Sequence, residues 1–132
     1  MIRVAAILFA GALVAAPLPS PLSPADAQKA FEVVPGLRVE LVAAEPLVAS
    51  PCAIAFDSKG RLFVAENRGY PIGPKEGEKP AGVIALLEDT DGDGRMDKRT
   101  VYADGLTFPN GVLPWGGGLI VTCAPDVLFL KD

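Results

Sequence analysis

The alternation of apolar and polar side chains predicts short β-strands along most of the chain. Residues 37–43 alternate as a half-exposed strand does. Residues 53–57 and 61–66 are two apolar runs joined by a tight turn, which predicts a hairpin. Residues 83–88 and 100–104 predict two further strands. Four strands that run up and down in order are the content of one propeller blade.

The same pattern starts again in the second half of the chain. Residues 111–124 align on residues 53–66 at an offset of 58, which places Gly118 on the turn residue Gly60. Trp115, just before a run of three glycines, is expected to be a core aromatic that precedes a flexible hairpin turn. A repeat of this length in a β protein indicates an array of propeller blades.

The end of the second unit also matches the first. Residues 127–132 align on residues 84–89 at an offset of 43, so Asp132 takes the place of Asp89. The offset changes because the long loop at residues 67–81 has no counterpart in the second unit. Residues 105–110 are expected to connect the two units.

The predicted fold is therefore all-β, a partial β-propeller of about one and a half blades out of six. In this interpretation residues 28–132 are the N-terminal portion of a propeller domain, and the other blades follow Asp132. Such a piece leaves sheet faces and an edge uncovered, so residues 28–132 alone are expected to fold poorly or to aggregate. A small β-sandwich is the alternative, because the strand spacing alone permits it.

The loop after residues 83–88 is acidic and rich in glycine, which is the pattern of a calcium loop. Ca²⁺ takes six to eight oxygen ligands at roughly 2.3–2.6 Å, and alternate carboxylates in a sharply turning loop can supply them. The pattern departs from a helix–loop–helix site, because Thr100 stands where a bidentate Glu belongs and a strand leads into the loop. An acidic hairpin turn that binds nothing is the alternative. The expected ligands are Asp89, Asp91, Asp93, the backbone carbonyl of Arg95 and, through a water, Asp97.

The first residues have the features of an export signal. A positive start with Arg3 precedes an apolar run from residue 4 to residue 16, and residues 25–27 form an A-x-A cleavage motif. The run is shorter than the about 20 residues that span a membrane. We therefore expect residues 1–27 to be a signal peptide and the protein to be periplasmic or attached to the cell envelope. A retained N-terminal anchor is the alternative, and no later segment is expected to cross a membrane.

Charge and composition narrow the chemistry further. The formal net charge is −4, which argues against a nucleic-acid partner. The chain has no histidine, so the commonest general base is absent from it. Cys52 and Cys123 form neither a CxxC nor a CxxCH motif, and they are either two free thiols or one disulfide.

Three segments resemble the start of a bacterial membrane-bound dehydrogenase family. They are PGLRVELVAAEPLVASPCAIAFDSKGRLFVAENRGYP at 35–71, VIALLEDTDGDGRMDKRTVYADGL at 83–106 and FPNGV at 108–112. The resemblance covers residues 31–132 and implies a propeller similar to those of sorbosone and soluble glucose dehydrogenases. Those sugar dehydrogenases use pyrroloquinoline quinone, a histidine base and arginines in a central funnel. Longer members of the family carry a C-terminal CxxCH segment that holds haem c. This chain has no histidine and no CxxCH motif, so the family's histidine base and haem c site either lie outside it or are absent.

The up-and-down order of the strands assigns each loop to one end of a blade. The acidic loop shares its end with the turn after residues 53–57, and the loop at 67–81 shares the other end with the connector at 105–110. The second end is where many propellers carry an active-site funnel, so the calcium is expected to be structural. No catalytic residue is identified, although a desolvated Glu66 could act as a base. The candidates for cofactor binding are Arg68, through a quinone carboxylate, Tyr70, by stacking on a ring, and Asn110.

Each of these candidates also has a plain structural explanation. Glu66 and Arg68 can form a solvated ion pair, and Tyr70 can cover the end of the sheet. Two classes of function therefore remain open. One is an exported oxidoreductase that oxidises a sugar or alcohol with a quinone and passes electrons to a cytochrome c. The other is a non-catalytic, calcium-stabilised propeller that binds a carbohydrate or a protein.

Overall fold

The computed structural model describes residues 20–131, so most of the predicted signal peptide and Asp132 lie outside the described residues. The described part begins with a short helix, α1 (Pro24–Lys29), whose N-terminus is capped by the side chain of Ser23. The helix covers the predicted cleavage motif at residues 25–27. Within residues 20–131, no helix combines the length and the apolar character needed to cross a membrane.

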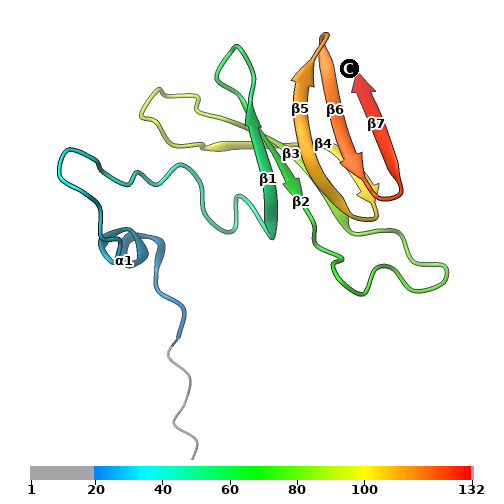
Figure 1. The fold of residues 1–132 in the computed structure, drawn as a ribbon, viewed down its shortest axis with the longest axis horizontal. Helices are drawn as coiled ribbons and strands as arrows, with labels where there is room; N and C mark the ends of the chain where they lie inside the picture. Colours follow the sequence, from blue (N-terminus) through cyan, green and yellow to red (C-terminus); the bar gives the residue numbers. More distant parts are fainter. Residues whose placement is uncertain (1–19, 132) are drawn as a thin grey trace, which may run out of the picture.

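Four strands form the first antiparallel sheet, which we name sheet A. They are β1 (Pro51–Phe56), β2 (Leu62–Glu66), β3 (Gly82–Glu88) and β4 (Lys98–Leu106). Their order in space is their order in sequence, as Figure 1 shows. The prediction of a four-stranded meander is therefore confirmed, and β4 extends beyond the predicted strand at both ends.

The second antiparallel sheet, sheet B, contains β5 (Pro109–Trp115), β6 (Gly118–Cys123) and β7 (Asp126–Lys131) in sequence order. The prediction of a connector at residues 105–110 is too long, because β4 runs to Leu106 and β5 starts at Pro109. The short link between β4 and β5 is held at both ends by strand pairing, since Leu106 pairs with Gly82 and Pro109 pairs with Cys123.

The first hairpin of each sheet has the same irregularity. In sheet A the register shifts between Pro51, which pairs with Glu66, and Ala53, which pairs with Ala65. In sheet B it shifts in the same way after Pro109, which pairs with Cys123. The first strands, β1 and β5, therefore match at the predicted offset of 58 residues, whereas β2 and β6 match at an offset of 57 residues.

The difference of one residue lies in the hairpin turn. Strand β5 pairs Trp115 directly with Gly118, so only two residues form the turn in sheet B. Gly117 (φ 78°) thus takes the place of Gly60 (φ 78°), and the predicted match of Gly118 with Gly60 is wrong. A positive φ of this size suits glycine, which has no Cβ to clash.

Each sheet has two faces, which we name so that residues at equivalent positions of the two sheets lie on the face of the same name. The front face carries Leu62 and Val64 in sheet A, and Leu119 and Val121 in sheet B. The back face carries Phe63 and Ile84 in sheet A, and Ile120 and Phe129 in sheet B. This division follows from the period of two along a strand.

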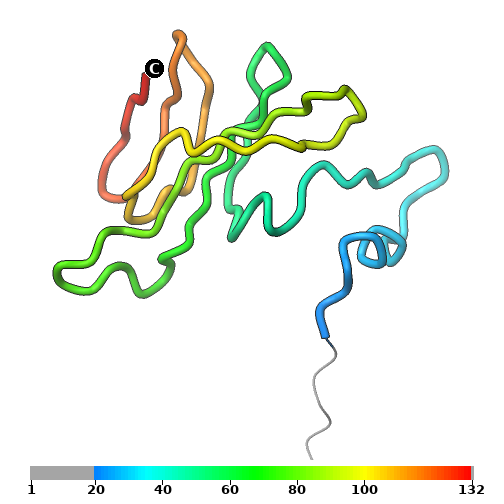
Figure 2. Tube along the Cα trace, turned by 180° about the vertical axis from the view of Figure 1, so that it is seen from behind, coloured from blue at the N-terminus to red at the C-terminus, as the bar shows by residue number. Residues whose placement is uncertain are grey.

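The main core lies between the back face of sheet A and the front face of sheet B. It contains these buried side chains: Phe63, Ala65, Ile84, Leu86, Leu119, Val121 and Cys123. The two sheets therefore stack through non-equivalent faces. Figures 1 and 2 show sheet B beside sheet A, with the N-terminal segment on the far side of sheet A.

A second core lies on the front face of sheet A. Leu62, Val64 and Leu87 are buried there together with Val48 and Ala85. The cover is a non-regular segment of the chain, residues 42–48, and Met96 of the acidic loop.

The strand expected at residues 37–43 is wrong, because no strand of the described chain pairs with this segment. A strand pattern yields a strand only where backbone pairing with a sheet is made, and this segment is paired with neither sheet A nor sheet B. Its fixed points are Val42 O, which accepts from Met96 N–H at 2.8 Å, and Val39 O, which accepts from the Gln28 side chain at 2.7 Å.

Candidate functional site

The acidic loop, residues 89–97, connects the end of β3 to the start of β4 and so closes a hairpin, as predicted. Three of its carboxylates converge: Asp89, Asp91 and Asp97 each place an oxygen within 4.8 Å of the other two. Asp93 is not part of this group, and its Oδ1 accepts instead from Arg95 N–H at 2.7 Å. The structure thus brings together three of the five predicted ligands.

Backbone amides hold the shape of the loop. Both carboxylate oxygens of Asp89 are acceptors, from Gly92 N–H at 2.7 Å and from Gly94 N–H at 2.9 Å. Hydrogen bonding from Gly94 is the main cause that lowers the pKa of Asp89, so this carboxylate is charged at neutral pH. Asp97 accepts from the hydroxyl of Thr90 at 2.7 Å.

The donor set fits a hard divalent cation. Carboxylate oxygens are the ligands that Ca²⁺ prefers, and the loop is exposed enough for water to complete a coordination shell. Met96, inside the loop, packs on the front face of sheet A and donates its N–H to Val42. The conformation of the acidic loop is therefore coupled to the cover over that face.

The other end of sheet A contains a buried charge. The Glu66 side chain is 0% exposed. Its Oε2 accepts from Arg68 Nη2 at 2.6 Å and from Arg99 Nη2 at 2.8 Å, and its Oε1 accepts from Ala49 N–H at 3.0 Å. Glu66 and Arg68 do form an ion pair, but the prediction that the pair is solvated is wrong for Glu66. The Glu66 carboxylate lies at the centre of a buried network.

This network changes the two roles considered for its members. The Glu66 carboxylate already accepts from two guanidinium groups and a backbone amide, so its oxygens are engaged, which does not favour its use as a free base. Arg68 is 37% exposed, and two arginines on one carboxylate leave an excess of one positive charge. Arg99 was not expected here, because it lies 33 residues away from Glu66 and sequence spacing gives no sign of the contact.

The remaining cofactor candidates lie near the link between the sheets. Tyr70 is 72% exposed and packs edge-on against Phe108, with ring centroids 6.1 Å apart. Asn110 accepts a hydrogen bond from the hydroxyl of Thr122. Arg68, Tyr70 and Asn110 thus contact three different groups, and no hydrogen bond or ring contact recorded among residues 20–131 joins them to one another.

Both cysteines are free thiols. The Cys52 thiol donates to the carbonyl oxygens of Pro109 at 3.1 Å and Ala65 at 3.3 Å, so it bridges the two sheets. Burial raises the pKa of the Cys52 thiol, which keeps it protonated as this donor role requires. Cys123 is buried in the main core.

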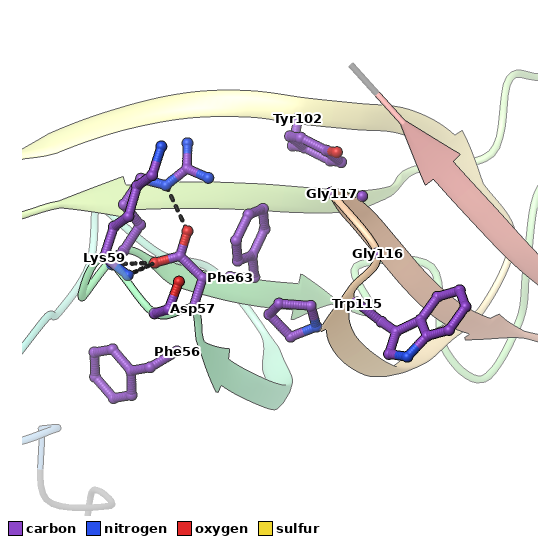
Figure 3. A pocket seen from close by; sticks show the side chains of 12 residues that line it. Phe56, Asp57, Lys59, Phe63, Tyr102, Trp115, Gly116 and Gly117 are labelled. Atoms are coloured by element: carbon purple, nitrogen blue, oxygen red, sulfur yellow. Dashed lines mark hydrogen bonds and ion pairs between the residues drawn. The ribbon is translucent and has the colours of Figure 1, made fainter.

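A cavity of about 470 Å³ lies between the β1–β2 turn and the β5–β6 turn (Figure 3). Its polar side is Asp57, which accepts from Arg61 Nε at 2.7 Å, and its apolar side is the edge-to-face pair of Phe63 and Tyr102. Burial would raise the pKa of Asp57, but hydrogen bonds from Arg61 outweigh it and the pKa is lowered. The sequence did not indicate this cavity, because its two halves come from different sheets.

Trp115 borders the cavity, yet its side chain points away from Asp57 and is 65% exposed. The prediction of a core aromatic is therefore wrong. The side chain lies on the back face of sheet B, where it contacts Phe129 with ring centroids 6.2 Å apart. No part of the described chain covers that face.

Comparisons with known proteins identify a family but no characterised relative. No curated protein matches the chain, and no solved structure matches it. The model of a family described as a domain of unknown function, DUF7133, matches residues 23–132. This match includes both sheets, the acidic loop and the Glu66 network, and the chain therefore belongs to the DUF7133 family.

Proposed function

We propose that the two sheets are the first one and a half blades of a β-propeller. The observation that carries this proposal is the stacking of the back face of sheet A on the front face of sheet B. Contact between non-equivalent faces of a repeated unit is heterologous, so each added unit offers the same face to the next. Such a series closes into a ring when the rotation per unit allows it, and propellers close with about four to eight blades.

The activity we propose is that of an exported, quinone-dependent oxidoreductase that acts on a sugar or an alcohol and passes electrons to a cytochrome c. Support comes from the resemblance of residues 31–132 to a dehydrogenase family. The loop at residues 67–81 supplies Arg68. Because Arg68 shares the Glu66 carboxylate with a second arginine, one positive charge remains to bind an acidic group. Pyrroloquinoline quinone carries carboxylates that a guanidinium can bind through two hydrogen bonds. The histidine base and the haem c would come from outside this chain.

The test of this activity is quinone-dependent dye reduction by the longest natural protein that contains the chain. Loading with pyrroloquinoline quinone is expected to produce activity, and Arg68→Ala is expected to weaken cofactor binding by about tenfold or more. Ile72→Ala is the matched control, because Ile72 is in the same loop and is 88% exposed. Equal cofactor binding in all three proteins would exclude Arg68 from the site, and absence of activity would favour the second class of function.

The second candidate is a calcium-stabilised propeller that binds a carbohydrate or a protein. It is favoured by the convergence of Asp89, Asp91 and Asp97. In either class the calcium would hold the acidic hairpin and offset the repulsion between neighbouring carboxylates.

Removal of two of these carboxylates is expected to abolish the calcium site. We expect Asp89→Asn/Asp91→Asn to bind calcium at least about tenfold more weakly, because affinity follows the number of charged ligands. Isothermal titration measures the difference, and Asp126→Asn is the control for a change of charge at an exposed aspartate elsewhere. Unchanged titration of the double variant would show that the loop is an acidic turn that binds no calcium.

A further inference from the structure

The cavity between the β1–β2 turn and the β5–β6 turn lies inside the contact between the two sheets, at one end of it (Figure 3). One wall is the back face of sheet A, where Asp57, Arg61 and Phe63 lie on the same side of the hairpin. The other wall includes Pro114, which pairs with Leu119 and so lies on the front face of sheet B. Both walls therefore belong to faces that already pack on each other, and neither is an open strand edge.

The acidic group of the lining is already fully used. Asp57 Oδ1 accepts from the N–H groups of Lys59 at 2.9 Å and Arg61 at 3.0 Å, and its Oδ2 accepts from Arg61 Nε at 2.7 Å. The Asp57 and Arg61 side chains, 11% and 33% exposed, neutralise each other as a pair. The net charge that remains on this wall is the positive charge of Lys59.

Several hydrogen-bond donors of the lining have no acceptor. Within residues 20–131, the Lys59 ammonium group makes no recorded ion pair or hydrogen bond. The N–H groups of Gly116 and Gly117, which line the opposite side, likewise donate to no recorded acceptor of the described chain. Free donors and a net positive charge favour a ligand with anionic oxygens. A neutral sugar suits the cavity less well, because its hydroxyl groups also need acceptors and Asp57 is the one carboxylate of the lining.

The remaining part of the lining is apolar and held in place. The rings of Phe63 and Tyr102 meet edge to face, with centroids 5.3 Å apart. The Tyr102 hydroxyl donates to the carbonyl oxygen of Leu130 at 3.4 Å, so its ring is fixed between the two sheets. A volume of about 470 Å³ is within the range of small-molecule sites. The cavity thus has room for a ring beside a charged group.

We propose that this cavity binds a small organic carboxylate that carries a ring. The carboxylate of the ligand lies at Lys59, and its ring packs against Tyr102 and Pro114. Binding needs no chemical step, and the site is formed by groups that the fold already holds in place.

The cavity is separate from both sites considered above. It lies at the end of sheet A where Leu62 pairs with Leu87, whereas Glu66 and Arg68 lie at the other end. The acidic loop is at the same end as the cavity, but its Met96 packs on the front face of sheet A and the cavity opens on the back face. None of the carboxylates of the acidic loop lines the cavity. The proposal therefore depends on neither quinone nor calcium.

Isothermal titration of the longest natural protein that contains the chain, with benzoate as the probe, tests the proposal. Benzoate is expected to bind at one saturable site. Lys59→Glu reverses the charge at the carboxylate and is expected to weaken binding by at least about tenfold. The control is Lys75→Glu, the same reversal at an exposed lysine of the loop at the other end, and it is expected to bind benzoate as the parent does.

Two further probes separate the charge from the ring. Benzyl alcohol lacks the charge and acetate lacks the ring, so each is expected to bind at least about tenfold more weakly than benzoate. NOEs from the benzoate ring protons to the Tyr102 ring are expected to locate the site. The proposal is overturned if benzoate does not bind, if Lys59→Glu binds it as the parent does, if either further probe binds equally well, or if bound benzoate gives no NOE to Tyr102.

Discussion

Replacement of Glu66 by alanine is expected to lower the free energy of unfolding by about 2–3 kcal/mol, because it leaves the part-buried Arg99 guanidinium and the Ala49 N–H without their acceptor. The Glu66 carboxylate accepts from Arg68, from Arg99 and from the Ala49 amide, and its side chain is 0% exposed. Without it, the Arg99 guanidinium, only 22% exposed, loses the acceptor that it bonds at 2.8 Å. Urea denaturation of the longest natural protein that contains the chain measures the loss.

The control is an ion pair at the surface. Asp104 accepts from Lys79 Nζ at 2.9 Å, and both side chains are more than half exposed. We expect Asp104→Ala to change stability by less than about 1 kcal/mol, because solvent screens such pairs. A loss at Glu66 as small as the loss at Asp104 would mean that Glu66 is solvated, as the sequence alone suggested.

Leu119→Ala is expected to cost about 2–5 kcal/mol, because it opens a cavity in the core between the sheets. Leu119 is 0% exposed and lies among Phe63, Ile84 and other side chains of the main core. Leu22→Ala is the matched control, since Leu22 is 62% exposed, and it is expected to cost less than about 0.5 kcal/mol. Thermal or urea unfolding of both variants provides the comparison, and equal losses would contradict the assignment of Leu119 to this core.

Most strands could be predicted because their apolar pattern is local. The runs that became β1, β2, β3 and β7 were predicted to within about two residues, which is the usual uncertainty of strand ends. The position of the acidic loop in a β-hairpin was also predictable, since the apolar run before it is too short for a helix. Calcium binding by that loop stays a prediction.

The errors occur where a contact depends on a distant part of the chain. Residues 37–43 have the pattern of a strand, but they pair with no strand of either sheet, and residues 42 and 43 pack on the front face of sheet A instead. Trp115 has the size of a core residue, yet it lies on a face that no described segment covers. Glu66 was expected in solvent, because its second arginine comes from another strand. Local sequence contains none of this information.

Stacking of the two sheets through non-equivalent faces is the central claim of this account. Methyl NOE spectroscopy on the protein tests it most directly, because NOEs connect methyl groups only over short distances. The account predicts NOEs from Ile84 to Leu119 and Val121, which lie in one core. A sandwich in which the two back faces meet would instead give NOEs from Ile84 to Ile120 and the Phe129 ring, and that result would contradict the account.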